Sequence, residues 1–137
     1  MRAAAATPDV LEAIATARAI VIGPSNPLVS IAPILAVPGI SGALRDAPAP
    51  VVAVSPLVRG RVLKGPTATF MRWAGLSLTS AGIAAAYAGV IDALVADEQT
   101  DAIPMLETDV LMDTAGARRH LAEETLRFAA ALRAGSG

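Results

Sequence analysis

The sequence predicts an α/β fold in which helices cover both faces of a mostly parallel sheet. Three short apolar runs, rich in β-branched residues, have the composition of strands buried on both faces: 19–22, 51–54 and 91–95. Turn-forming residues follow each run, and stretches with helical spacing separate the runs. A weaker fourth strand is expected at 110–112. Strands that alternate with helices in this way predict right-handed crossovers and a parallel sheet.

Helices are expected before, between and after these strands. Phe70 and Trp73 share one face of a helix, so both aromatic side chains are predicted to lie in the core. Asp113 or Thr114 is expected to cap the last helix. Leu121, Thr125, Phe128 and Leu132 form its inward stripe. The predicted helix ranges are 8–17, 28–45 with breaks at Pro33 and Pro38, 67–75, 80–88 and 115–133. Residues 135–137 are expected to be a flexible tail.

Composition excludes several classes of protein. The 137 residues are enough for one domain, expected over 1–137, that buries its own core. The absence of cysteine excludes disulfides, thiolate nucleophiles and zinc fingers. A net charge of -1 excludes a broadly basic surface for nucleic acid, and no apolar run is long enough to span a membrane. The first six residues lack the apolar length of an export signal, so a cytoplasmic protein is predicted.

The turn after the first strand is the most informative loop. Its sequence is Gly23-Pro24-Ser25-Asn26-Pro27, and open α/β sheets bind ligands at the carboxyl ends of their strands. A helix that begins here could receive a phosphate on its free N–H groups, with Ser25 and Asn26 beside the ligand. Alternatively, Ser25 or Asn26 simply caps the helix. The residues alone leave both interpretations open.

The loop after the second strand carries Arg59, Arg61 and Lys64, the only lysine, followed by Gly65-Pro66-Thr67. A lysine close to a glycine and a hydroxyl could bind a phosphate, but the glycine spacing is not that of a P-loop. Spacing alone therefore favours a solvated basic loop in which Thr67 caps the next helix.

Few side chains are candidates for acid–base catalysis or metal binding. Asp97 and Glu98 end the third strand, while Asp109 and Asp113 flank the expected fourth strand. Carboxylates in such positions could hold Mg²⁺ together with phosphate oxygens, although helix capping is the favoured role of Asp113. The only histidine, His120, lies within the last helix and is expected on the surface.

One long segment resembles a known family. Residues 23–40 read Gly-Pro-Ser-Asn-Pro-Leu-Val-Ser-Ile-Ala-Pro-Ile-Leu-Ala-Val-Pro-Gly-Ile, similar to the signature of the 2-phospho-L-lactate transferases, called CofD in archaea and FbiA in actinobacteria. The resemblance continues through 52–56, 63–66, 108–109 and Met112. It implies a Rossmann-like fold and transfer of a phospholactyl or phosphoenolpyruvyl group from a guanosine diphosphate-linked donor to the deazaflavin Fo. This reaction releases GMP in coenzyme F-420 biosynthesis.

The resemblance also implies Mg²⁺ and a homodimer, and it covers only the C-terminal part of the family. The glycine-rich loop and acidic metal ligands of the family's N-terminal half have no match here, so a truncated or split product is expected, with a complementary N-terminal half as the other possible partner. A non-catalytic nucleotide- or sugar-nucleotide-binding module of the same superfamily, or an inactive fragment, is the alternative. The substrate- or nucleotide-binding residues implied are Gly23, Pro24, Ser25, Asn26, Pro27, Ser30, Ser55, Lys64, Gly65 and Thr67.

Overall fold

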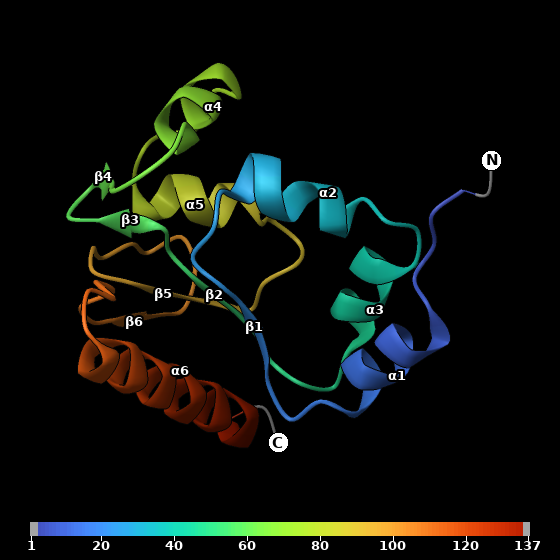
Figure 1. The fold of residues 1–137 in the computed structure, drawn as a ribbon. Helices are drawn as coiled ribbons and strands as arrows, with labels where there is room; N and C mark the ends of the chain where they lie inside the picture. The colour runs from blue at the N-terminus through green and yellow to red at the C-terminus, as the bar shows by residue number, and fades with distance from the viewer. Residues whose placement is uncertain (1–2, 136–137) are drawn as a thin grey trace.

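A computed structural model of the chain describes residues 3–135 and has a four-stranded sheet at its centre (Figure 1). All neighbouring strands run parallel, in the order β1-β2-β5-β6. This sheet and the helices on its two faces confirm the predicted α/β, Rossmann-like fold class. The strands are β1 (Ile20–Ile22), β2 (Val51–Val54), β5 (Ala93–Ala96) and β6 (Met105–Glu107).

The two central strands are apolar throughout because both of their faces are buried. Along β2, Val51 and Ala53 belong to one core cluster, while Val52 and Val54 belong to the cluster on the opposite face. All four side chains are buried. This is why β2 reads as a continuous apolar run in the sequence rather than as an alternating one.

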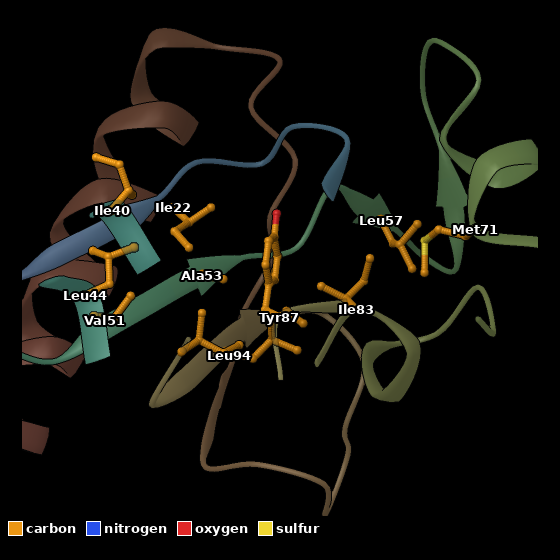
Figure 2. Close-up of a cluster of buried hydrophobic side chains, with 12 residues drawn as sticks. Ile22, Ile40, Leu44, Val51, Ala53, Leu57, Met71, Ile83, Tyr87 and Leu94 are labelled. Atoms are coloured by element: carbon orange, nitrogen blue, oxygen red, sulfur yellow. The ribbon is translucent and has the colours of Figure 1, made fainter. Parts of the chain in front are cut away.

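Several short helices cover one face of the sheet (Figure 1). The core on this face joins strand residues to Ile40, Leu44, Met71 and Ile83 (Figure 2). Tyr87 also lies in this core, and its hydroxyl is buried without a hydrogen-bond partner. Burial raises the pKa of Tyr87 to about 12. The helices that follow predicted ranges are α1 (Pro8–Thr16), α3 (Ile40–Asp46), α4 (Thr67–Trp73) and α5 (Ser80–Ala86).

The last helix, α6 (Ala115–Gly135), covers the other face. Its predicted inward stripe is confirmed, since Leu121, Thr125 and Ala129 are buried and Phe128 and Leu132 pack against the same core. Thr114, and not Asp113, is the cap: its hydroxyl accepts a hydrogen bond from the Ala117 N–H at 3.0 Å. The tail expected at 135–137 lies outside the described residues except for Gly135, which ends α6.

The helix expected over 28–45 is three separate segments. It begins as a π-helix, η1 (Pro27–Ile31), continues as α2 (Ala32–Leu35), and resumes as α3 after a turn. Pro33 has no N–H to donate to the preceding turn, and Gly39 adopts a left-handed conformation with φ of 98°.

Among residues 3–135 no single helix is long and apolar enough to cross a membrane. One pair of helical segments, Pro27–Leu35 and Ile40–Asp46, reaches that length and composition together, but it is bent by 85°.

The prediction of a fourth strand at 110–112 is wrong. The fourth strand is β6, and residues 110–112 are an irregular segment beyond it. The Asp109 carboxylate accepts a hydrogen bond from the Leu111 N–H at 2.9 Å, which turns the chain just after the sheet. The third strand also begins later than expected, at Ala93. Just before it, the Asp92 carboxylate accepts a hydrogen bond from the Val51 N–H at 2.7 Å.

Candidate functional site

The turn between β1 and η1 is organised by Asn26. Its side-chain oxygen accepts hydrogen bonds from the N–H groups of Leu28 and Val29, at 2.9 and 3.1 Å, so Asn26 caps η1. The Ser25 N–H donates to the carbonyl oxygen of Gly23 at 2.8 Å. These N–H groups are therefore already engaged, and Pro24 has none to offer. The capping interpretation of Asn26 is therefore confirmed, and these three N–H groups are not free for a ligand.

The loop after β2 contains a hairpin that the sequence analysis did not predict. β3 (Leu57–Val58) pairs with the antiparallel strand β4 (Arg61–Val62). Arg59 and Gly60 connect them, both with positive φ, at 51° and 71°. Such a two-residue turn matches the twist of a hairpin. Gly60, with Leu57 and Val58 before it and Val62 and Leu63 after it, was the signal for the turn in the sequence.

Ser55 and Thr67 lie at the two ends of this loop, and both are buried. The Ser55 hydroxyl accepts a hydrogen bond from the Leu57 N–H at 3.1 Å, so Ser55 shapes the start of the hairpin. The prediction that Thr67 caps α4 is wrong. The cap position is Pro66, which makes no side-chain capping bond, and Thr67 is the first helical residue. Lys64 is exposed between the hairpin and α4.

A cleft of about 710 Å³ lies between the β1–η1 turn and the segment from Ser55 to Thr67. Cavities of this size commonly hold small molecules. Gly23 and Pro27 do not line the cleft, and Pro27 is buried. The other predicted site residues do line it: Pro24, Ser25, Asn26, Ser30, Ser55, Lys64, Gly65 and Thr67.

A third wall of the cleft comes from residues 110–113, which the sequence analysis did not place at the site. Asp113 is the only carboxylate in the lining, and Lys64 is its only ammonium group. The lining also includes large apolar side chains that are unusually exposed: Val29 at 46%, Leu63 at 62% and Met112 at 39%. The cleft therefore combines hydroxyl groups and one cation with an apolar surface.

The acidic candidates mostly hold backbone groups in place. Asp97 accepts a hydrogen bond from the Arg59 N–H at 2.8 Å, and Glu98 accepts one from the Ser80 N–H at 2.8 Å. A second hollow of about 470 Å³ is lined by Arg59, Asp97, Glu107, Thr108 and Asp109. Within residues 3–135, no three Asp, Glu, His or Cys side chains come together in a group that could hold a metal ion.

The side chains of Trp73 and His120 are exposed, and that of Phe70 is only partly buried. The prediction that Trp73 is core is wrong, because its side chain is 85% exposed, and Phe70 is only partly buried. Met71, between them, is the fully buried residue of α4. His120 is exposed, as expected.

The sequence matches the family described as 2-phospho-L-lactate transferase CofD over residues 1–126. This match covers nearly the whole chain. The chain belongs to the 2-phospho-L-lactate transferase family. The resemblance carried by residues 23–40 is thereby confirmed.

Curated relatives within this transferase family are similar over most of the chain. A phosphoenolpyruvate transferase of Mycolicibacterium smegmatis is 38% identical over 77% of the chain and 37% of its own length. A 2-phospho-L-lactate transferase of Halobacterium salinarum is 48% identical over 69% of the chain and 28% of its length. That of Methanospirillum hungatei is 37% identical over 88% of the chain and 41% of its length. The chain thus spans well under half the length of these relatives.

Proposed function

We propose that the cleft binds donor phosphates during a group transfer in coenzyme F-420 biosynthesis. A phospholactyl or phosphoenolpyruvyl group passes from a guanosine diphosphate-linked donor to the deazaflavin Fo, and GMP is released. The observation that carries this proposal is that Ser25, Ser30 and Lys64, from two separate loops, line one cleft. Membership of the 2-phospho-L-lactate transferase family and the names of the relatives support it.

The proposed chemistry depends mainly on position and charge. A hydroxyl oxygen of Fo forms a bond to the donor phosphorus, the phosphoanhydride bond to GMP breaks, and the hydroxyl proton is lost. Such transfers are accelerated by aligning the reactants and by neutralising charge on the phosphoryl oxygens. The Lys64 ammonium supplies positive charge, and the hydroxyls of Ser25 and Ser30 supply hydrogen-bond donors. The exposed apolar side chains of Val29, Leu63 and Met112 suit a flat deazaflavin ring.

The proposal includes Mg²⁺ bound to the donor phosphates, with its protein ligands outside this chain. Asp113 is the one carboxylate in the cleft lining, and a Mg²⁺ site commonly uses one or two carboxylates together with phosphate oxygens and water. The remaining groups of the site would come from a complementary N-terminal half or from a second copy in a homodimer.

Calorimetric titration of the chain with GDP, with and without Mg²⁺, tests the nucleotide site. We expect saturable binding, weakened at least about tenfold by Lys64→Gln because a charge-assisted contact to phosphate is lost. Arg45→Gln is the matched control, since Arg45 is an exposed cation on α3 outside the cleft. Absence of saturable binding, or equal weakening in both variants, would overturn the proposal. Asn26 is left intact because it caps η1.

Transfer is tested separately by measuring GMP release in the presence of the donor and Fo. GMP release that depends on Lys64 supports a transferase. Nucleotide binding without GMP release, even when the unmatched part of the M. smegmatis relative is co-expressed, would instead favour the non-catalytic nucleotide-binding module.

A further inference from the structure

Two buried hydroxyl side chains line the cleft with hydrogen-bonding capacity to spare. Ser55 and Thr67 are only 2% and 4% exposed, yet both belong to the cleft lining. The Ser55 oxygen accepts a hydrogen bond from the Leu57 N–H at 3.1 Å, and within residues 3–135 its own proton has no acceptor. The Thr67 hydroxyl has no hydrogen-bond partner in this part of the chain. Since buried polar groups in proteins are normally paired, these two hydroxyls point to a ligand in the cleft.

The Thr67 hydroxyl opens on the cleft and is not sealed in the core. Three described side chains carry a polar atom that is both sealed from solvent and unpartnered: Asn26 at Nδ2, and Tyr87 and Thr125 at their hydroxyls. Thr67 is not among them although its hydroxyl has no partner, so its oxygen is open to the space that Thr67 lines. A ligand in the cleft can therefore accept a hydrogen bond from it.

Both hydroxyls are held by rigid parts of the fold. Ser55 directly follows β2, and its N–H donates to the Val95 carbonyl oxygen at 2.8 Å, which continues the bonding of the sheet. Thr67 is the first residue of α4, and Met71, one turn later on the same face, is fully buried. The sheet thus fixes one hydroxyl and the packing of α4 fixes the other, so a ligand would meet two preorganised donors.

The wall that carries both hydroxyls is cationic. Residues 47–91 contain no acidic side chain, and this wall therefore favours an anionic ligand. The hydroxyls themselves are uncharged and buried, and a phosphate dianion would lose more hydration beside them than a carboxylate, which bears one charge. Two hydroxyl donors also match the two oxygens of a carboxylate. The cations of residues 47–91 are Arg59, Arg61, Lys64 and Arg72.

We propose that Ser55 and Thr67 bind the carboxylate of the transferred group, while the donor phosphates lie at the exposed side chains of Ser25, Ser30 and Lys64. A phospholactyl and a phosphoenolpyruvyl group each carry a carboxylate close to the phosphate, so one pair of hydroxyls serves either. This inference rests on the proposed function, because it requires the cleft to hold the donor. It assigns specificity for the transferred group to two residues that the nucleotide does not need.

Calorimetric titration of the chain with phosphoenolpyruvate, inorganic phosphate and GDP tests this subsite. We expect Thr67→Val, which removes the hydroxyl and keeps the shape, to weaken phosphoenolpyruvate binding at least about tenfold, and binding of phosphate and GDP less than about twofold. Thr67→Ser keeps the hydroxyl and should bind all three as the unaltered chain does. Thr69→Val is the matched control, since Thr69 is exposed on α4 outside the cleft lining.

Two outcomes would overturn the inference. One is equal weakening of phosphoenolpyruvate and phosphate binding in Thr67→Val, which would assign the hydroxyl to the phosphoryl group. The other is phosphoenolpyruvate binding that is absent from the unaltered chain or unchanged in Thr67→Val. Circular dichroism checks that Thr67→Val is folded, and Thr67→Ala, which needs less space, gives the same comparison if it is not.

Lys64→Gln separates this inference from the proposed function. It should weaken GDP and phosphoenolpyruvate binding alike, because both ligands carry phosphate, whereas Thr67→Val should affect only the ligand with a carboxylate. GDP binding that is absent or independent of Lys64, together with phosphoenolpyruvate binding that depends on Thr67, would count against the nucleotide site and leave the carboxylate subsite standing.

Discussion

One face of the sheet is covered by several short segments, whereas a single long helix covers the other. The first core cluster draws Leu44 from α3, Ile83 from α5 and Leu57 from the hairpin after β2. The second cluster is closed by α6, through Leu121 and Ala129. Leu57, in the hairpin beside the cleft, belongs to the first cluster, whereas Val110, in the cleft lining, belongs to the second, so both faces support the cleft as well as the sheet. The first face consists of several short elements, whereas α6 can shift as one unit, so a cavity on the first face should cost more stability than one under α6.

A pair of identical substitutions tests this comparison most directly. Leu94→Ala removes a fully buried side chain from β5 on the first face, and we expect it to lower the free energy of unfolding by about 4 kcal/mol. Leu121→Ala, on the second face, should cost about 3 kcal/mol because α6 can shift to fill part of the cavity. Denaturant unfolding measures both values. Equal losses, or a larger loss for Leu121→Ala, would contradict the comparison.

The next largest effect is expected at Gly82, in α5 on the first face. A Cβ atom at this position would lie 1.8 Å from the backbone carbonyl oxygen of Ser77, so one of the two segments must move. We expect Gly82→Ala to cost roughly 3 kcal/mol. Gly42→Ala is the matched control: Gly42 is in α3, and no atom lies within 4 Å of its Cβ position. It should stabilise the chain by up to about 1 kcal/mol, through higher helix propensity. A destabilised control would show that α3 tolerates no change, and a stable Gly82→Ala variant would contradict the close approach.

The burial of each element explains whether it could be predicted from the sequence. β2 and β5 were found because burial on both faces makes a strand uniformly apolar. The fourth strand was misplaced because an edge strand, β6, is only half buried, while the more apolar run at 110–112 lines the cleft instead. For α4, the spacing of Phe70 and Trp73 showed that they share a face, but spacing does not show which face is buried. Met71 occupies the core.

The sequence predicted some of the residues that line the cleft and missed others. Residues that follow strand ends, such as Ser25 and Ser55, can be assigned from the chain alone, since parallel strands end at one edge of the sheet. Lys64 lies farther along its loop. Its glycine and hydroxyl neighbours suggested phosphate binding, spacing alone favoured a solvated loop, and the resemblance to the family made it a predicted site residue. Residues 110–113 were missed because their place depends on how the chain turns back after β6. The Asp109 side chain holds that turn by accepting a hydrogen bond from the Leu111 N–H.

Tyr87 makes the stability of the first face depend on pH. Burial raises the pKa of this tyrosine, the only one in the chain, to about 12 from about 10. The folded state thus retains the proton at pH values where the unfolded state loses it. Stability is fully present below pH 10 and falls by about 2 kcal/mol as the pH rises toward 12. Unfolding measured across this range should show the fall.

The matched variant for this effect is Tyr87→Phe, which should remove the alkaline loss. It should also be stable at neutral pH, since the Tyr87 hydroxyl has no partner in the described structure and its removal eliminates the cost of burying it. Alkaline destabilisation of the same size in Tyr87→Phe would show that another group is responsible. Strong destabilisation at neutral pH would indicate that the hydroxyl makes a bond to an internal water.

The smallest effect is expected at the start of α6, which covers the second face. Thr114→Ala removes the hydroxyl that accepts the Ala117 N–H, and we expect a loss of about 1 kcal/mol in unfolding free energy. Asp113→Ala is the control, because Asp113 makes no capping bond and should change stability by a few tenths of a kcal/mol at most, through its charge near the helix N-terminus. Thr114→Ser should retain full stability.

Since α6 is held by Leu121, Thr125 and Ala129 along its length, loss of the Thr114 cap should fray the first turn of the helix and leave the sheet intact. Hydrogen exchange confined to residues 115–118 in Thr114→Ala would confirm this, whereas exchange across β2 and β5 would mean that both faces depend on the cap.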